Sequence, residues 1–301
     1  MVRTDLGDHT WRFELRSEGA SHASSHPHFT CTRCGTVTCL PEDAVTLSRG
    51  RSLPSAVSRS VTSTARREDP RFRALLHAAL GDARTVVNVG AGTGSYEPRD
   101  RHVLAIEPSD VMAAQRPPEL APALRAFADS LPLRDGSVDA ALAVLTVHHW
   151  DEGQEKGVRE LRRVARGPVV LLTYDAEVSG RTWLMADYLP ELAALDRRIF
   201  PTMERLAQWL GGEVRVEPVP IPRDTPDWML GSFWAHPERV LDPAARASTS
   251  GFARMAPGVV ERVVTQLTKD LADGTWERRH GHLRALDAYD VGLRLVVARP
   301  E

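Results

Sequence analysis

The chain has 301 residues, of which 42 % are hydrophobic and 26 % are charged, with 38 basic residues against 40 acidic ones. This balance is typical of a soluble globular protein, and its length predicts one large domain with a smaller appendage. A net charge of −2 supplies no positive field for nucleic acid or for an anionic membrane, so neither is an expected partner.

The start of the chain lacks the apolar run of a secretory signal, and the apolar stretch 140–145 is far too short to span a membrane. All three cysteines lie between positions 31 and 39. An odd, clustered set of cysteines argues against a disulfide framework and fits a reducing compartment. We therefore expect a cytoplasmic protein.

The first 64 residues differ in texture from the rest. Residues 1–45 are polar and rich in histidine, with a possible strand pair at 10–15 and 29–40, and residues 46–64 have the small, basic composition of a linker. The remaining residues, 65–301, are expected to form the main domain.

The main domain begins with apolar residues at helical spacing, from Phe72 to Leu80, and Gly81 is placed to end that helix. Strand and helix patterns then alternate, with the clearest helix at 152–165. The predicted strands are 85–89, 102–106, 124–128, 139–145, 169–173, 213–218 and 291–298. This alternation predicts an α/β fold with a doubly wound, mostly parallel sheet, and residues 219–288 form a largely helical insertion before the last strand.

Three glycines, Gly90, Gly92 and Gly94, directly follow the first buried strand of this domain. A loop without Cβ atoms lets the backbone approach a ligand closely, although a tight turn between elements has the same composition. Ser95 stands where the dinucleotide pattern G-x-G-x-x-G requires its third glycine. The spacing instead resembles motif I of the class I methyltransferases that depend on S-adenosylmethionine (SAM).

Two later segments strengthen this resemblance. The second strand ends in Ile106-Glu107-Pro108-Ser109, where a carboxylate can accept hydrogen bonds from two ribose hydroxyls. The segment 127–133 resembles the family's D-A-E-x-L-P run, followed by a loop into strand four at 135–141. Because Phe127 occupies the first acidic position, Asp129 or a main-chain group is expected to contact adenine.

The resemblance is closest to the small-molecule branch called methyltransferase type 11, which is similar to UbiE. It implies a Rossmann-like sheet of seven strands whose last strand is antiparallel, with SAM as cofactor. Asn88 stands where the family usually has an acid, so we expect weaker SAM binding there unless another carboxylate compensates. The implied cofactor-binding residues are Asn88, Gly90, Ala91, Gly92, Gly94, Glu107, Pro108, Ser109, Ala128, Asp129, Ser130, Leu131 and Leu145.

Candidates for catalysis follow strand four, in a segment that faces the transferred methyl group in this family. His149 or His148 is a candidate base or substrate contact, although one of them has an equally good structural role in capping or packing. Asp151 is a plausible N-cap for the next helix, and Thr173-Tyr174-Asp175 offers a second polar cluster. In the insertion, which is expected to be a lid, the aromatic residues either contact the acceptor or form the insertion's own core. They are Trp228, Phe233, Trp234 and Trp276.

The N-terminal run H-P-H-F-T-C-T-R-C-G resembles part of the dimerisation domain of ferric-uptake-regulator repressors. That resemblance implies a zinc site, for which the candidate ligands here are Cys31, Cys34, Cys39 and His28. The family's second C-x-x-C pair is missing, so the alternative is a remnant that binds no metal.

Taken together, the sequence predicts a SAM-dependent methyltransferase that transfers a methyl group to an O, N or C atom of a small molecule. The alternatives are a metal-responsive regulator with a zinc-binding N-terminal fragment, and a SAM-binding protein without catalysis.

Overall fold

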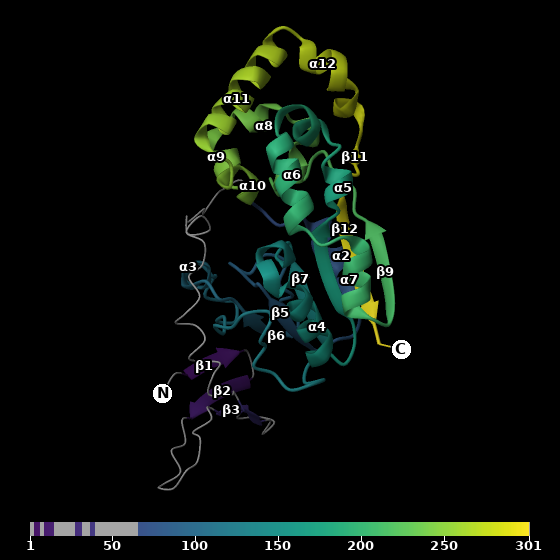
Figure 1. Ribbon diagram of the computed structural model, residues 1–301. Coiled ribbons are helices and arrows are strands. Elements are labelled where there is room, and N and C mark those ends of the chain that lie inside the picture. Colours follow the sequence, from purple (N-terminus) through teal and green to yellow (C-terminus); the bar gives the residue numbers. More distant parts are fainter. Residues whose placement is uncertain (1–2, 7–8, 15–27, 32–36, 40–65, 301) are drawn as a thin grey trace.

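The computed structural model describes residues 3–6, 9–14, 28–31, 37–39 and 66–300 (Figure 1). Before residue 40, the described backbone forms short antiparallel strands in the order β1-β2-β3-β4. They are β1 (Arg3–Leu6), β2 (His9–Glu14), β3 (His28–Cys31) and β4 (Val37–Cys39). The predicted strand pair is confirmed, with its second run divided between β3 and β4.

A mixed sheet in the order β6-β5-β7-β8-β12-β9 forms the centre of residues 66–300. Its strands are β5 (Thr85–Val89), β6 (His102–Ile106), β7 (Ala140–Val144), β8 (Val169–Tyr174), β9 (Glu213–Pro218) and β12 (Leu293–Arg299). β6, β5, β7 and β8 run parallel, and β12 runs antiparallel to both β8 and β9. The predicted doubly wound sheet with an antiparallel last strand is confirmed.

The strand count differs from the prediction, because the described sheet has six strands rather than seven. The run 124–128 makes only an isolated parallel bridge between Leu124 and Ile106. A few residues later, the main chain of Leu131 is hydrogen-bonded to Glu160 and Arg163 instead. The segment therefore leaves the sheet after one paired residue.

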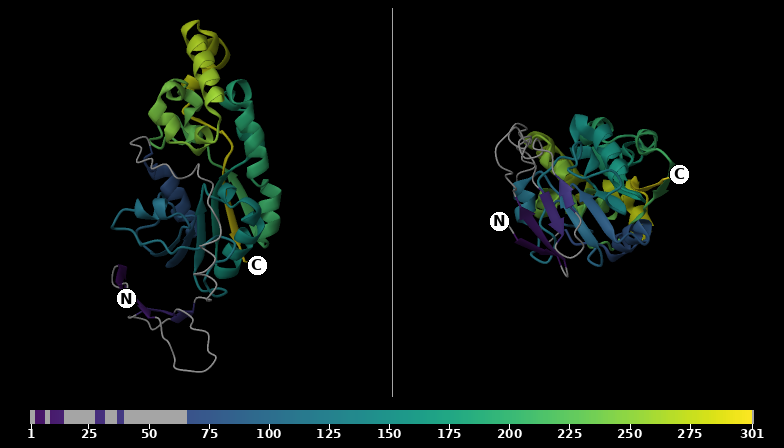
Figure 2. Two further views of the ribbon diagram at one scale, coloured as in Figure 1. Left: turned by 60° about the vertical axis from the view of Figure 1, so that its left-hand side comes forward. Right: turned by 90° about the horizontal axis from the view of Figure 1, so that it is seen from below.

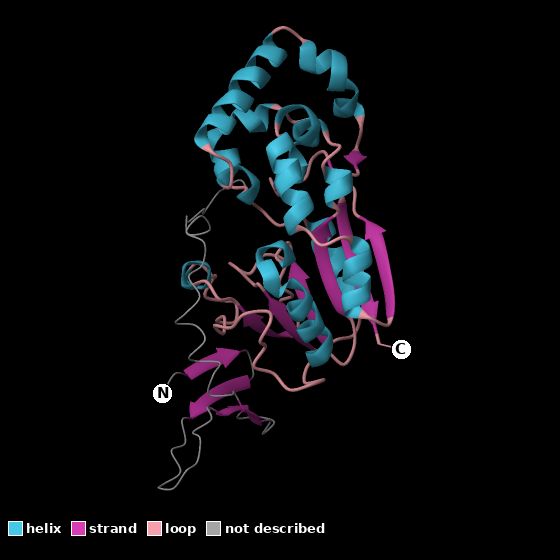
Figure 3. Ribbon diagram, viewed as in Figure 1, coloured by secondary structure: helices cyan, strands magenta, loops and turns pink. Residues whose placement is uncertain are grey.

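Helices cover both faces of the sheet, as Figures 1 and 3 show. On one face, α2 (Pro70–Leu80) packs its buried side chains in the same core cluster as alternate residues of β5 and β8. On the other face, α4 (Gln154–Val164) and α7 (Met203–Leu210) pack in a second cluster. This cluster contains the intervening residues of β5 and β8, whose side chains point to the opposite face of the sheet. This division follows from the two-residue repeat of side chains along a strand, because each strand is buried on both faces.

Of the helix ends predicted from the sequence, the one at Gly81 is confirmed and the one at Asp151 is not. Asp69 caps α2, accepting a hydrogen bond from Arg71 N, and Gly81 ends it with a φ of 57°, as predicted. The predicted N-cap at Asp151 is wrong. Asp151 lies in a 3-10 turn, Asp151–Gly153, and Gly153 occupies the N-cap of α4 without a side-chain hydrogen bond.

A layer of helices lies over the carboxyl ends of the parallel strands, as the first view of Figure 2 shows clearly. Part of it follows β8, namely α5 (Ala176–Ser179), the π-helical turn η5 (Leu184–Tyr188) and α6 (Pro190–Ile199). The rest lies between β9 and β12, where the insertion was predicted. It comprises η6 (Leu230–Ala235), α8 (Glu238–Leu241), α9 (Pro243–Ala247), α10 (Ser250–Ala253), α11 (Pro257–Ala272), α12 (Thr275–His280) and η7 (Gly281–Ala285).

The insertion leaves and rejoins the sheet at one place, because β10 (Ile221–Pro222) pairs antiparallel with β11 (Ala288–Tyr289). Most of its aromatic residues form its core: Phe233, Trp234 and Trp276 are buried. Trp228 is partly buried and lies 4.5 Å from the guanidinium of Arg239. Of the two roles considered for these aromatic residues, the core role is the one found for the three buried side chains.

Candidate functional site

The glycine loop leaves the carboxyl end of β5, where open α/β sheets place their ligands. Gly90, Gly92 and Gly94 have φ values of 70°, 52° and 95°. A Cβ on Gly90 would lie 2.0 Å from Oγ1 of Thr146. Because the first glycine packs directly on the segment after β7, neither its backbone conformation nor its surroundings leave room for a side chain.

Glu107, at the end of β6, is brought directly onto this loop. Its carboxylate accepts hydrogen bonds of 2.8 Å from Gly92 N and from Ser109 N. Burial raises the pKa of Glu107 in spite of these two hydrogen bonds. Ser109 also caps the short helix α3 (Asp110–Ala114), accepting a hydrogen bond from Met112 N. Two separate sequence motifs, the glycines and the strand-end acid, thus form one structural unit.

Asn88, the residue that replaces the usual acid, lies beside a carboxylate that sequence reasoning missed. Its Nδ2 donates a 3.0 Å hydrogen bond to Oε2 of Glu97. Glu97 accepts two hydrogen bonds of 2.9 Å from Arg116, and Arg116 also donates to the carbonyl oxygen of Gly92. No helix follows the loop before β6. This buried ion pair, rather than a helix, therefore holds the glycine loop in position.

Three further predicted cofactor residues lie in the glycine loop or just after the neighbouring strands β6 and β7. Ala91 is buried in the loop itself, Pro108 is half-buried, and Leu145 has an uncommon positive φ of 51° just before Thr146. Such conformations in residues other than glycine cluster at functional sites.

The other predicted segment, 128–131, lies against α4. A Cβ on Gly153 would be 3.3 Å from Oδ2 of Asp129, and one on Gly157 would be 3.1 Å from the Cβ of Ala128. Ser130 is exposed, and Leu131 is bonded to α4 as described above. Asp129 therefore lies beside the N-terminus of a helix, a favourable place for a carboxylate.

His148 and His149 lie in the 3-10 turn Val147–His149, which is separated from the end of β7 by two residues. The ring of His148 stacks on Phe200 at 4.2 Å, and its buried Nδ1 has no hydrogen-bond partner. Burial, together with the charge of Arg254, lowers the pKa of His149 to about 4. Burial also holds the pKa of His148 well below its ordinary range. Both imidazoles are therefore neutral at pH 7.

Further groups from the helical layer complete this cluster. Nη2 of Arg254, which follows α10, lies 2.7 Å from Nδ1 of His149. Tyr174, at the end of β8, meets Phe200 edge-on and lies 3.2 Å from the sulfur of Met229. Asp196 of α6 is mostly buried, which raises its pKa to about 7 although the charge of Arg254 opposes this. Sequence reasoning missed both Arg254 and Asp196, which lie far from the histidines along the chain.

Of the predicted polar cluster Thr173-Tyr174-Asp175, only Tyr174 takes part in these contacts. Asp175 caps α5, accepting hydrogen bonds from Glu177 N and Val178 N. Thr173 is fully buried, and its hydroxyl has no hydrogen-bond partner.

A second polar network joins the glycine loop to the insertion. The buried phenol of Tyr96 donates to Asp227 at 2.8 Å and accepts from Asp69 N at 3.0 Å. Asp227 also forms an ion pair with Arg66, and Tyr96 N donates to Glu68. The loop, the start of α2 and the start of the insertion therefore meet at one hydroxyl group.

The side chains of the four predicted metal ligands lie outside what the structure describes. Cys34 is not among the described residues, and for Cys31, Cys39 and His28 only the backbone is described. The register of β3 and β4 places His28 opposite Cys39. Within the part of the chain that the structure describes, no group of three potential ligands could hold a metal ion. The zinc site stays a prediction.

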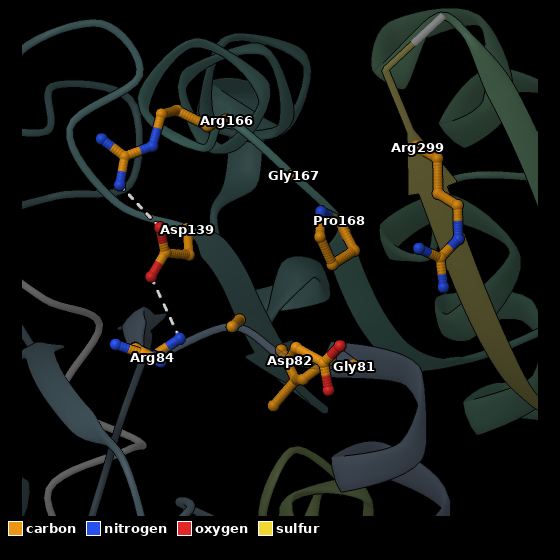
Figure 4. Close-up of a pocket in the computed structure, with 10 residues that line it drawn as sticks. Gly81, Asp82, Arg84, Asp139, Arg166, Gly167, Pro168 and Arg299 are labelled. Carbon is orange, nitrogen blue, oxygen red and sulfur yellow. Dashed lines mark hydrogen bonds and ion pairs between the residues drawn. The ribbon is translucent and has the colours of Figure 1, made fainter.

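An open pocket of about 430 Å³ lies at the other end of the sheet (Figure 4). Its lining includes Arg84 before β5, Asp139 before β7, Pro168 before β8 and Arg299 at the end of β12. Asp139 is held by Arg166 and by the main chain of Arg84. Because these are the amino ends of the parallel strands, this pocket is remote from the glycine loop and is not the candidate site.

Comparisons with known proteins agree with the geometry. A family model described as a methyltransferase domain matches residues 87–172, which run from β5 into β8. A solved structure described as a putative methyltransferase from an antibiotic biosynthesis pathway of Anabaena variabilis is 32 % identical. The similarity covers 78 % of this chain and 99 % of that chain, with a TM-score of 0.72.

A second solved structure, a phosphoethanolamine N-methyltransferase of Haemonchus contortus, is 11 % identical with a TM-score of 0.50. It covers 100 % of this chain and 71 % of its own, and at this identity the likeness concerns the fold alone. A comparison with curated proteins found no match to this chain. The family model begins at residue 87 and so gives no support to a regulator fragment at the N-terminus. No described helix is long and apolar enough to cross a membrane.

Proposed function

The chain belongs to the methyltransferases, as its relative of 32 % identity shows, and we propose that it is a class I member that uses SAM to methylate a small-molecule acceptor. The observation that carries the proposal is the hydrogen bond from Gly92 N to the carboxylate of Glu107. It joins the glycine loop to the acid of the second strand, at the edge of the sheet where such folds bind ligands. The methyl group would pass to an O, N or C atom of the acceptor.

The residues present fit SAM as the cofactor. A Cβ placed on Gly92 would meet only the end of Met112, at 3.5 Å, so the backbone there is approachable. Glu107 would accept hydrogen bonds from the ribose hydroxyls, Asp129 or a neighbouring main-chain group would contact adenine, and the glycine loop would hold the methionine end. Bound there, SAM supplies a methyl group that its sulfonium has already activated.

The chain's own work is then to position the acceptor and to exclude water. We propose that the insertion, residues 219–288, acts as the lid that does so, since its helices lie over the carboxyl ends of the strands (Figure 3). The acceptor would lie near His148 and His149, because their turn directly follows Thr146, which packs on Gly90.

For His149, the role of substrate contact is better supported than that of base. An arginine side chain only donates hydrogen bonds, so Nδ1 of His149 must accept the one from Arg254. The proton of the neutral imidazole is therefore on Nε2, which makes that nitrogen a donor toward an acceptor molecule. For His148, Nδ1 has no hydrogen-bond partner, so no contact at that nitrogen fixes which of the two nitrogens carries the proton.

Titration calorimetry with S-adenosylhomocysteine tests the cofactor site. The wild-type protein should bind it, and Glu107→Ala should weaken binding by about 1–3 kcal/mol, the scale of a lost buried hydrogen bond. Glu155→Gln, which changes an exposed acid of α4, serves as the control and should bind normally. Absence of binding to the wild-type protein at millimolar ligand would overturn the proposal. We also propose a cytoplasmic location, which the clustered cysteines favour.

A further inference from the structure

Arg254 differs from the other partly buried arginines of residues 66–300 in its hydrogen-bond partner. Each of the others is bonded to at least one carboxylate, carbonyl or hydroxyl oxygen; Arg116 and Arg239 are examples. Among the described residues, the hydrogen-bond partner of Arg254 is Nδ1 of His149, at 2.7 Å. No described carboxylate lies within ion-pair distance of its guanidinium. A half-buried guanidinium without an oxygen partner is well suited to a ligand that brings one.

The contact between Arg254 and His149 leaves several donors free to serve a ligand. Because Nδ1 accepts from Arg254, the imidazole carries its proton on Nε2. The guanidinium has five N–H groups, and the contact with His149 occupies one of them. Two donor side chains of different elements thus lie together at the carboxyl edge of the sheet, a pairing suited to an oxygen-rich anion.

Aromatic rings border these donors. His148 lies 4.0 Å from His149 and 4.2 Å from Phe200, measured between ring centroids, and Tyr174 meets Phe200 at 86°. The Nδ1 atom of His148 is buried without a hydrogen-bond partner. An unpaired buried nitrogen costs free energy, so the described residues alone do not satisfy this cluster.

The charges around Arg254 also favour an anion. The imidazoles of His148 and His149 are neutral at pH 7, and burial keeps the phenol of Tyr174 protonated by raising its pKa. Asp196 is the acid whose titration Arg254 influences, and it is only partly ionised near neutral pH. The guanidinium is therefore the dominant charge of this cluster.

We propose that the methyl acceptor is a carboxylic acid, bound as its anion by the guanidinium of Arg254 and by Nε2–H of His149. This inference rests on the proposed methyltransferase function, and it adds the chemical class of the acceptor. A carboxylate matches the planar fork of arginine with two parallel hydrogen bonds. It is also ionised at neutral pH, so no proton has to be removed: one carboxylate oxygen would form a bond to the methyl carbon as the bond from that carbon to the sulfonium sulfur breaks, which would give a methyl ester and S-adenosylhomocysteine.

The test uses benzoate as the probe and benzamide as its neutral counterpart, each titrated into the complex of the full chain with S-adenosylhomocysteine. Benzoate should bind and benzamide should bind at least about tenfold more weakly, the scale of losing a hydrogen bond to a charged group. Arg254→Gln should weaken benzoate binding by about tenfold or more. Arg254→Lys keeps the charge without the fork, and an intermediate loss is expected.

Arg262→Gln is the matched control, because Arg262 is a half-exposed arginine of the same insertion that pairs with Glu191. It should bind benzoate as the wild-type protein does. Absence of benzoate binding to the wild-type complex, or equal binding to Arg254→Gln, overturns the proposal.

The affinity for S-adenosylhomocysteine, measured on the same samples, separates the two hypotheses. If the wild-type protein does not bind it, the methyltransferase function itself fails. If it binds but benzoate is not distinguished from benzamide, only the acceptor class is wrong. A variant that has lost S-adenosylhomocysteine binding is judged misfolded, and Arg254→Lys then decides the outcome.

Discussion

The carboxylate of Glu97 and the guanidinium of Arg116 form an ion pair of 2.9 Å beneath the glycine loop, with side chains only 1 % and 3 % exposed. Both partners are further satisfied, since Asn88 donates to Glu97 and Arg116 donates to the carbonyl oxygens of Gly92 and Ala121. The position of the loop at Gly92 thus depends on the buried ion pair of Glu97 and Arg116.

Arg116→Leu should therefore destabilise the protein by about 3–5 kcal/mol, because it leaves the buried carboxylate of Glu97 without its charge partner. Denaturant unfolding measures this loss. Arg159→Leu removes one partner of an exposed pair with Glu155 and should cost about 0.5 kcal/mol or less. Equal losses from the two substitutions would show that the pair under the loop contributes no more than a surface pair.

Gly90→Ala should cost more than Gly81→Ala, although both glycines have similar φ values of 70° and 57°. An added Cβ at Gly81 meets no atom within 4 Å, so only the backbone strain of a sparsely populated conformation, about 1–3 kcal/mol, applies. At Gly90 the Cβ would also overlap the side chain of Thr146. Thermal unfolding and S-adenosylhomocysteine titration should both show the larger defect in Gly90→Ala. Matching defects would mean that Thr146 moves away without cost.

Asp196 should make the free energy of unfolding depend on pH. Burial raises the pKa of Asp196 in the folded protein to about 7, from an ordinary value of 3.8. The folded state then binds the carboxyl proton of Asp196 more tightly than the unfolded state does. The stability that the protonated carboxyl group allows is therefore fully present below about pH 4 and is lost as the pH rises through 7. Asp196→Asn should therefore stabilise the protein by about 2 kcal/mol or more at pH 8, with little effect near pH 4.

Urea unfolding at pH 4.5 and pH 8 measures this difference. Asp82→Asn, at an exposed position before β5, is the control and should change stability equally at both pH values. A pH-independent effect of Asp196→Asn would mean that the carboxyl group titrates normally in the folded protein.

The pKa of His149 should rise in Arg254→Gln. Burial is the main cause of its low value of about 4, and the charge of Arg254 adds to it. Removing that charge should move the midpoint toward the ordinary range and should also free Nδ1. Nitrogen-15 NMR of the imidazoles reports both changes, and Arg262→Gln should leave them unaltered. An unshifted His149 would contradict the hydrogen bond on which the acceptor hypothesis depends.

Local patterns were enough to predict the six strands of the sheet and the two motifs that lie next to one another, but they also predicted a strand at 124–128 that the sheet does not contain. β5 and its glycines are continuous in sequence, and Glu107 ends the next strand, so the rule for parallel strand ends brings them together. The helix at Pro70–Leu80 followed from the spacing of its apolar residues and from Gly81. Where a single residue had to decide, as for Asp151 at the start of α4, the prediction was wrong because the turn there places Gly153 at the N-cap.

The rest of the site depends on contacts that no local pattern contains. His149 and Arg254 are separated by 105 positions, and the helical insertion that contains Arg254 has no spacing that identifies one arginine among many. The sequence predicted that another carboxylate would compensate for Asn88, and Glu97, three residues after Gly94, is the carboxylate that Asn88 contacts. Only the fold shows that Arg116 neutralises it. The catalytic and cofactor roles assigned from the sequence stay predictions that binding experiments will decide.

The hydroxyl of Tyr96 has a mechanical consequence. It is hydrogen-bonded both to the main-chain nitrogen of Asp69, just before α2, and to Asp227, near the start of the insertion. A hinge for opening the lid would therefore be expected beyond Asp227, since motion at an earlier point would break this bond or drag the glycine loop along. Opening of the lid at such a hinge would then leave both hydrogen bonds of the Tyr96 hydroxyl intact and the glycine loop undisturbed.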